Sequence, residues 1–71
     1  MKTRTSARNQ LKGKITAIDI GSVNVTVTID IGGGNCITAM ITKQSCEGLG
    51  LKVGGEAYAV IKASSVMVGI D

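Results

Sequence analysis

Three short segments of this chain combine hydroxyl groups, cationic side chains and backbone N–H groups in a way that suits a small anion. The candidate ligands in these segments are Ser6, Arg8, Thr42, Ser45, Lys62, Ala63 and Ser64. A fully ionised tetrahedral oxyanion only accepts hydrogen bonds, so its site needs hydroxyls, N–H groups and cations, with no carboxylate nearby. Taken singly, each candidate has a structural explanation, because Thr42 could cap a helix and Lys62 could be a solvated strand end. The residue types favour an oxyanion site, while their spacing alone does not identify a ligand.

The sequence contains few residues that could catalyse a reaction. There is no histidine to act as a base near neutral pH. The five acidic residues form no close pair of carboxylates along the chain. The run of glycines at residues 32–34 is not followed by Gly-Lys-Ser/Thr, so it does not match a phosphate-binding P-loop. Cys36 and Cys46 lack the paired spacing of a zinc site. We therefore expect no enzyme, no catalytic residue and no bound metal ion or cofactor.

Positive charge is concentrated near the N-terminus. The net charge is +3, and five cationic residues precede Asp19, the first acid: Lys2, Arg4, Arg8, Lys12 and Lys14. Such a segment attracts anions, although a solvated terminus would have the same composition. Nucleic acid is not the expected partner, because single-strand binding relies on stacking and Tyr58 is the only aromatic residue.

Neither a signal peptide nor a membrane span is evident in the sequence. The first residues contain no apolar stretch, and the longest apolar runs are only a few residues long. We therefore expect a cytoplasmic protein with reduced thiols and no membrane association.

The clearest strand signal lies at residues 23–30, where β-branched apolar residues alternate strictly with polar ones. The side chains expected to face a core are Val23, Val25, Val27 and Ile29. Residues 11–20 predict a long strand before it, with a bend or bulge at Gly13. A tight turn at residues 21–22 is expected to join the two strands.

The rest of the chain predicts three more strands and one helical turn. In order, these are a glycine-rich turn at 32–35, a strand at 36–41, a helical turn capped by Thr42 over 43–47 and ended by Gly48, a turn at 53–56, and strands at 57–62 and 66–70. Five strands with one short helix after the third predict an all-β fold, an OB-like five-stranded Greek-key barrel. Residues 1–71 are expected to form a single domain.

A chain of this size has a thin margin of stability. Small domains bury a small share of their surface and are usually reinforced by disulfides, a metal or partner subunits. The first two are not expected here, whereas hydrophobic residues make up 44% of the chain. The sequence also contains no proline that would block strand edges. Together these features favour an oligomer.

Three stretches resemble the molbindins, the small molybdate-binding Mop proteins. Residues 5–15 (Thr-Ser-Ala-Arg-Asn-Gln-Leu-Lys-Gly-Lys-Ile) resemble the family's opening motif, and residues 59–67 (Ala-Val-Ile-Lys-Ala-Ser-Ser-Val-Met) its second signature. Residues 49–55 (Leu-Gly-Leu-Lys-Val-Gly-Gly) resemble the connection after its short helix. The resemblance covers essentially the whole chain. It implies an OB-like barrel that assembles as a homo-hexamer, a trimer of dimers with strands exchanged between partners.

The resemblance also implies a ligand and a division of the site between subunits. One subunit would supply Ser6, Arg8, Lys62 and the backbone N–H of Ala63, and its neighbour Thr42 and Ser45, with Ser64 as a further candidate. The ligand would be molybdate or tungstate, and the function its intracellular binding, storage and buffering. Two alternatives stay open: a regulatory module whose assembly responds to the oxyanion, and nucleic-acid binding of the OB type.

Overall fold

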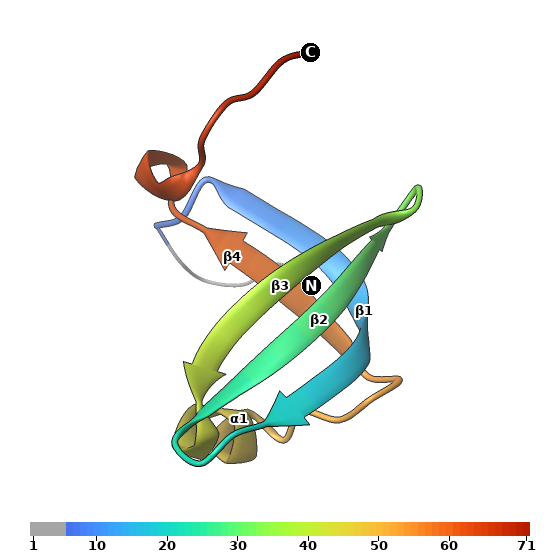
Figure 1. The fold of residues 1–71 in the computed structure, drawn as a ribbon, viewed down its shortest axis with the longest axis vertical. Coiled ribbons are helices and arrows are strands. Elements are labelled where there is room, and N and C mark those ends of the chain that lie inside the picture. Colours follow the sequence, from blue (N-terminus) through green and yellow to red (C-terminus); the bar gives the residue numbers. More distant parts are fainter. Residues whose placement is uncertain (1–5) are drawn as a thin grey trace.

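The computed structural model describes residues 6–71 and shows a mostly β fold with one short helix, as predicted. Lys2 and Arg4 of the predicted cationic segment lie outside the described residues. The elements in chain order are β1 (Asn9–Ile20), β2 (Asn24–Gly32), β3 (Asn35–Thr42), α1 (Lys43–Leu49), β4 (Glu56–Ile61) and the 3-10 turn η1 (Ala63–Ser65). The strands form one curled antiparallel sheet in the order β3-β2-β1-β4 (Figure 1).

The long strand β1 is shared between two partners. Its first half pairs with β4, from Asn9 opposite Ile61 to Lys14 opposite Glu56, and its second half pairs with β2. The predicted irregularity lies between Ile15 and Ala17 and not at Gly13, so that prediction was wrong.

Gly13 permits a close approach between β1 and β2 and does not form the irregularity of β1. A Cβ atom there would lie 2.5 Å from the carbonyl oxygen of Asp30 and 2.6 Å from Cγ2 of Ile29. Distances this short exclude any side chain without a shift of the Asp30 backbone. The glycine therefore stands where β1 passes from one partner strand to the other.

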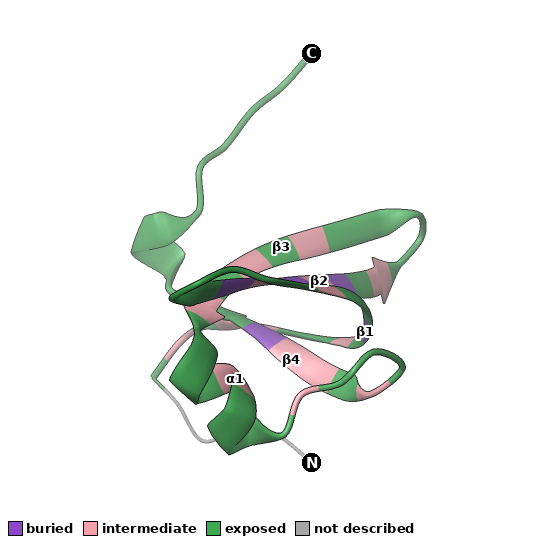
Figure 2. Ribbon diagram, turned by 60° about the horizontal axis from the view of Figure 1, so that its bottom comes forward, coloured by how far each residue is buried: buried purple, intermediate pink, exposed green. Residues whose placement is uncertain are grey.

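The core lies on the concave face of the sheet. Its buried residues are Ile15, Val25, Val27, Ile29 and Ala59 (Figure 2). Three of the four side chains predicted from the alternation are therefore buried. Val23 was expected with them but is 68% exposed, because it belongs to the turn that precedes β2. The alternation continues one residue beyond the strand, and periodicity cannot show where pairing stops.

The helix begins where predicted and ends later. Thr42 is its N-cap, and its hydroxyl oxygen accepts a hydrogen bond from the Ser45 N–H at 3.0 Å. Gly48 was expected to end the helix but lies inside it. Gly50 ends it in the left-handed conformation, with φ 66°, and its N–H is bonded to the Glu47 carbonyl. A glycine stops a helix only where its backbone leaves the helical conformation.

The predicted fifth strand is absent from the single chain. Residues 66–71 leave the sheet as an extended tail (Figure 1), and Met67, Val68 and Ile70 are more than nine-tenths exposed. The single chain therefore forms four strands where five were expected, because an apolar segment becomes a strand only when it pairs with the edge of another strand. An apolar groove of about 330 Å³ lies in the curled sheet. Its lining residues come mainly from β2, β3 and β4 and include Val27, Ile41 and Val60.

Candidate functional site

The first group of candidate residues lies where β1 begins and β4 ends. Asn9 and Ile61 form the last pair of that ladder, so Arg8 and Lys62 are the next residues outward on the two strands. Both side chains are exposed. Within residues 6–71 the one salt bridge joins Lys12 to Glu56 at 3.8 Å, so no described carboxylate neutralises Arg8 or Lys62. This end of the sheet therefore carries two cations without a described ion-pair partner, one on each side of the last strand pair, with Ser6 two residues before Arg8.

Backbone donors lie beside these cations in the η1 turn. Its first hydrogen bonds run from the Ser65 N–H to the Lys62 carbonyl at 2.9 Å and from the Val66 N–H to the Ala63 carbonyl at 3.2 Å. The N–H groups of Ala63 and Ser64 precede the first of these bonds and have no acceptor in the described part of the chain. Such orphan donors at the start of a helical turn are satisfied by water or by a ligand. The resemblance to the molbindins implies a role for the backbone N–H of Ala63, which is the first residue of this turn.

The second group, Thr42 and Ser45, lies at the start of α1. The Thr42 hydroxyl donates to the Ser45 Oγ at 2.8 Å and accepts from the Ser45 N–H at 3.0 Å. The Lys43 N–H is bonded to the Val23 carbonyl at 2.9 Å, which holds the helix start against the β1–β2 turn. In this arrangement the Thr42 hydroxyl is occupied, and the hydroxyl hydrogen of Ser45 is free to point outward. The first turn contains no acidic residue that would repel an anion.

The two groups lie at opposite ends of β1 in one chain (Figure 1). Thr42 pairs with Asn24 beside the C-terminal end of β1, whereas Arg8 and Lys62 lie beyond its N-terminal end. β1 has 12 residues, a strand contour on the order of 35–40 Å. One oxyanion cannot reach both groups within the same chain. The structure thus brings together Arg8, Lys62 and Ala63, and separately Thr42 and Ser45.

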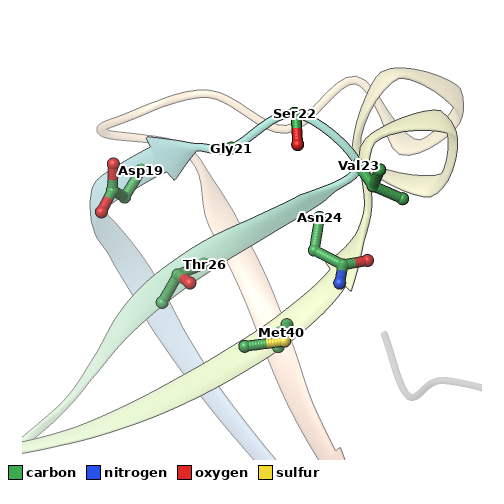
Figure 3. Close-up of a pocket in the computed structure, with 7 residues that line it drawn as sticks. All are labelled: Asp19, Gly21, Ser22, Val23, Asn24, Thr26 and Met40. Atoms are coloured by element: carbon green, nitrogen blue, oxygen red, sulfur yellow. The ribbon is translucent and has the colours of Figure 1, made fainter.

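A shallow hollow of about 320 Å³ lies at the β1–β2 turn (Figure 3). Its lining residues are Asp19, Gly21, Ser22, Val23, Asn24, Thr26 and Met40. None of them was predicted as a ligand, and the carboxylate of Asp19 makes the hollow unsuitable for a dianion. The sequence signal that could have indicated this hollow is the Gly-Ser pair of the turn at residues 21–22.

Two further features bear on function. Residues 6–71 contain no group of three or more His, Cys, Asp or Glu side chains that could hold a metal ion. None of the described helices has the length and apolar character needed to cross a membrane.

Comparison with known sequences relates the chain to one domain family and to small proteins of similar length. Residues 5–68 match the TOBE domain. A protein of Haemophilus influenzae named probable molybdenum-pterin-binding protein is 56% identical over 68 residues. The match covers 96% of this chain and 99% of that protein.

Solved structures agree with the sequence comparison. An apo form of MopII from Clostridium pasteurianum has a TM-score of 0.88 and 46% identity, over 94% of this chain and 100% of the other. The cytoplasmic molybdate-binding protein ModG, in a structure with molybdate bound, has a TM-score of 0.90 and 49% identity. That match covers 97% of this chain and 49% of the ModG chain. At these identities the similarity extends to both fold and sequence.

Proposed function

This chain belongs to the TOBE domain family, and on that premise we propose that it binds molybdate or tungstate at sites formed between subunits. The similarity to MopII and to molybdate-bound ModG supports the assignment, in agreement with the resemblance to the molbindins. The observation that carries the proposal is the pair of complementary half-sites at opposite ends of β1. One contains cations and free N–H groups, the other contains hydroxyls, and neither is complete alone.

The chemistry of the half-sites suits a dianion that only accepts hydrogen bonds. Arg8 and Lys62 would neutralise its two charges, and Ser6, Ser45 and the N–H groups of Ala63 and Ser64 would donate to its oxygens. Thr42 would contribute by holding Ser45, or directly if its hydroxyl turns toward the ligand. Charge-assisted hydrogen bonds contribute about 1.5–3 kcal/mol each. Several of them would support a dissociation constant on the order of micromolar once the entropic costs of association are met.

A bare oxyanion fits these residues better than a pterin-bound molybdenum, which the name of the Haemophilus influenzae relative would suggest. A pterin is a ring system much larger than a tetrahedral oxyanion, and aromatic side chains provide large apolar surfaces against which such rings can pack. Tyr58 is the only aromatic residue of the chain and is partly buried on β4, beyond the described half-sites. The donors at both ends of β1 match oxygen atoms and offer no surface for a ring.

The assembly that would complete the site is a homo-hexamer, a trimer of dimers with exchanged strands. The exposed apolar tail at residues 66–70 and the apolar groove in the sheet support this proposal. A tail from a second chain would bury its side chains in such a groove and supply the strand that one chain lacks. Burial of apolar surface contributes about 25 cal/mol per Å², so both chains would gain from the exchange.

We propose that residues 1–71 act as one domain in storage and buffering of the oxyanion in the cytoplasm, since the relative ModG is a cytoplasmic molybdate-binding protein. The role would be binding without catalysis, because the half-sites supply donors and cations but no general base. No second function is favoured by a specific observation. A regulatory module that responds to the oxyanion would need a partner, and nucleic-acid binding would need stacking residues.

Native mass spectrometry with and without molybdate tests the proposal most directly, since it reports subunit number and anion count together. We expect six chains and several bound anions per assembly. A monomer that binds molybdate would contradict the shared site, and an oligomer without bound anion would contradict the ligand. A titration with single-stranded oligonucleotides under the same conditions should show no comparable binding.

A further inference from the structure

Two primary amides lie directly behind the cationic half-site, in Asn9 and Gln10. The Asn9 Nδ2 donates across the sheet to the carbonyl oxygen of Ile61, the residue before Lys62, at 3.3 Å. The Gln10 Nε2 donates backward along its own strand to the carbonyl oxygen of Ala7, at 3.3 Å. Both side chains are partly buried, whereas Arg8 and Lys62 are exposed. One amide thus ties β1 to β4, and the other ties the segment that carries Arg8 to β1.

We propose that Asn9 is a positioning residue of the oxyanion site, which holds Arg8 and Lys62 at a fixed separation by bridging β1 to the end of β4. This inference rests on the proposed function and adds to it a residue outside the ligand set. Asn9 does not touch the anion in this scheme. It acts through the Ile61 carbonyl, and Gln10 supports it by restraining Ala7.

The position of this bridge explains why the half-site needs it. The ladder between β1 and β4 ends at Asn9 and Ile61, so Arg8 and Lys62 have no further strand pairing to hold them. Strand ends with exposed backbone open more readily than the centre of a sheet. A side-chain hydrogen bond at the last pair reduces that opening. Because less freedom is then lost when the anion binds, the affinity rises without a new contact to the ligand.

The chemical type of the residue matters as much as its hydrogen bond. An aspartate at position 9 would have nearly the same shape, but it could not donate to the Ile61 carbonyl. It would also place a negative charge one residue from Arg8 and opposite the start of the Lys62 turn. The amide therefore supplies a donor in a place where a carboxylate would repel the dianion.

The test compares two near-isosteric substitutions, Asn9→Leu and Asn9→Asp, in the assembled protein. Calorimetry with molybdate gives the dissociation constant at low and moderate salt, and thermal unfolding and native mass give stability and assembly. Asn35→Asp is the matched control, because it makes the same change of charge in the hairpin between β2 and β3, where no proposed ligand lies. Amide hydrogen exchange at residues 61–65 in the anion-free protein reports whether the strand end opens.

Asn9→Leu should weaken molybdate binding about fivefold, the scale of one net neutral hydrogen bond. Asn9→Asp should weaken it about a further tenfold at low salt, as expected for a unit charge about 6 Å from a dianion in a water-like dielectric. Added salt should reduce the difference between the two variants, since that difference is electrostatic. Both variants should accelerate exchange at residues 61–65 while keeping the assembly, and Asn35→Asp should bind like the parent protein.

The possible failures are distinguishable. A parent protein that does not bind molybdate would overturn the proposed function itself. A parent protein that binds, with both Asn9 variants binding equally well, would overturn the positioning role and leave the function standing. A third outcome is that the losses in molybdate affinity follow a lower unfolding temperature or a loss of the assembly, with no salt-dependent difference between the Asn9→Leu and Asn9→Asp variants. Asn9 would then be a structural residue only, and the proposal would also be refuted.

Discussion

Substitution of Arg8 by alanine separates a specific oxyanion site from general attraction by a cationic surface. Arg8 precedes β1, is exposed and has no ion pair in the described residues. Its removal should therefore leave the core and the sheet unchanged. In the proposed site, however, it supplies one of the two positive charges that face the dianion.

The size of the expected loss follows from simple electrostatics. A unit charge about 4 Å from a dianion contributes about 2 kcal/mol in a water-like dielectric. A subunit interface excludes water, and deletion of one partner of a desolvated charged pair costs about 2–5 kcal/mol. Arg8→Ala should accordingly raise the dissociation constant of molybdate by about 30-fold or more.

Lys12→Ala is the matched control for this experiment. It removes the same charge from the same segment, but Lys12 lies on β1 and is paired with Glu56 through an exposed contact of 3.8 Å. Exposed pairs of this kind contribute between 0 and about 1 kcal/mol. Calorimetry at low and moderate salt should show a large, persistent effect for Arg8 and a small one for Lys12. Equal losses that disappear with salt would show that the segment is only an electrostatic attractor, and the site assignment would be wrong.

Four further predictions concern the other half-site, selectivity, packing and assembly. Ser45→Ala should weaken molybdate binding about tenfold in calorimetry, because the loss of a hydrogen bond to a charged group costs about 1.5 kcal/mol; parent-like affinity would remove Ser45 from the site. Phosphate, which keeps a proton near neutral pH that needs an acceptor, should compete poorly with molybdate, while tungstate should compete equally; tight phosphate binding would refute the donor-only shell. Gly13→Ala should destabilise the protein by about 1–3 kcal/mol in denaturant unfolding, because its Cβ would lie 2.5 Å from the Asp30 carbonyl oxygen; an unchanged midpoint would show that the strands can separate freely. Deletion of residues 66–71 should reduce the assembly to smaller species in sedimentation, and an intact oligomer would contradict exchange of the tail.

The sequence by itself determined the parts of this protein that depend on neighbouring residues. Strict alternation placed Val25, Val27 and Ile29 on the core face of β2, because successive side chains of a strand point to opposite sides. Thr42 was predicted as a helix cap from its type and position, and its hydroxyl accepts the expected bond from the helix. The turn at residues 32–35 was predicted because glycine adopts positive φ without steric cost, and all three of its glycines do so.

Only the tertiary structure decided where these elements stop and what they pair with. The end of the helix moved from Gly48 to Gly50, and the irregularity of β1 moved from Gly13 to the residues after Ile15. In both cases several glycines or strand positions were locally equivalent, and contacts with distant segments selected one. The tail at residues 66–70 has a strand-like composition but pairs with neither edge strand, β3 or β4, of its own chain.

The candidate site shows the same division between local and distant information. The sequence indicated which residues could donate to an oxyanion, since donor chemistry belongs to each residue separately. It did not show that Arg8 and Lys62 both lie just beyond the last pair of β1 and β4, or that Thr42 and Ser45 lie at the far end of β1. Those positions depend on strand register, which is set by pairing between residues more than 50 positions apart, such as Asn9 and Ile61.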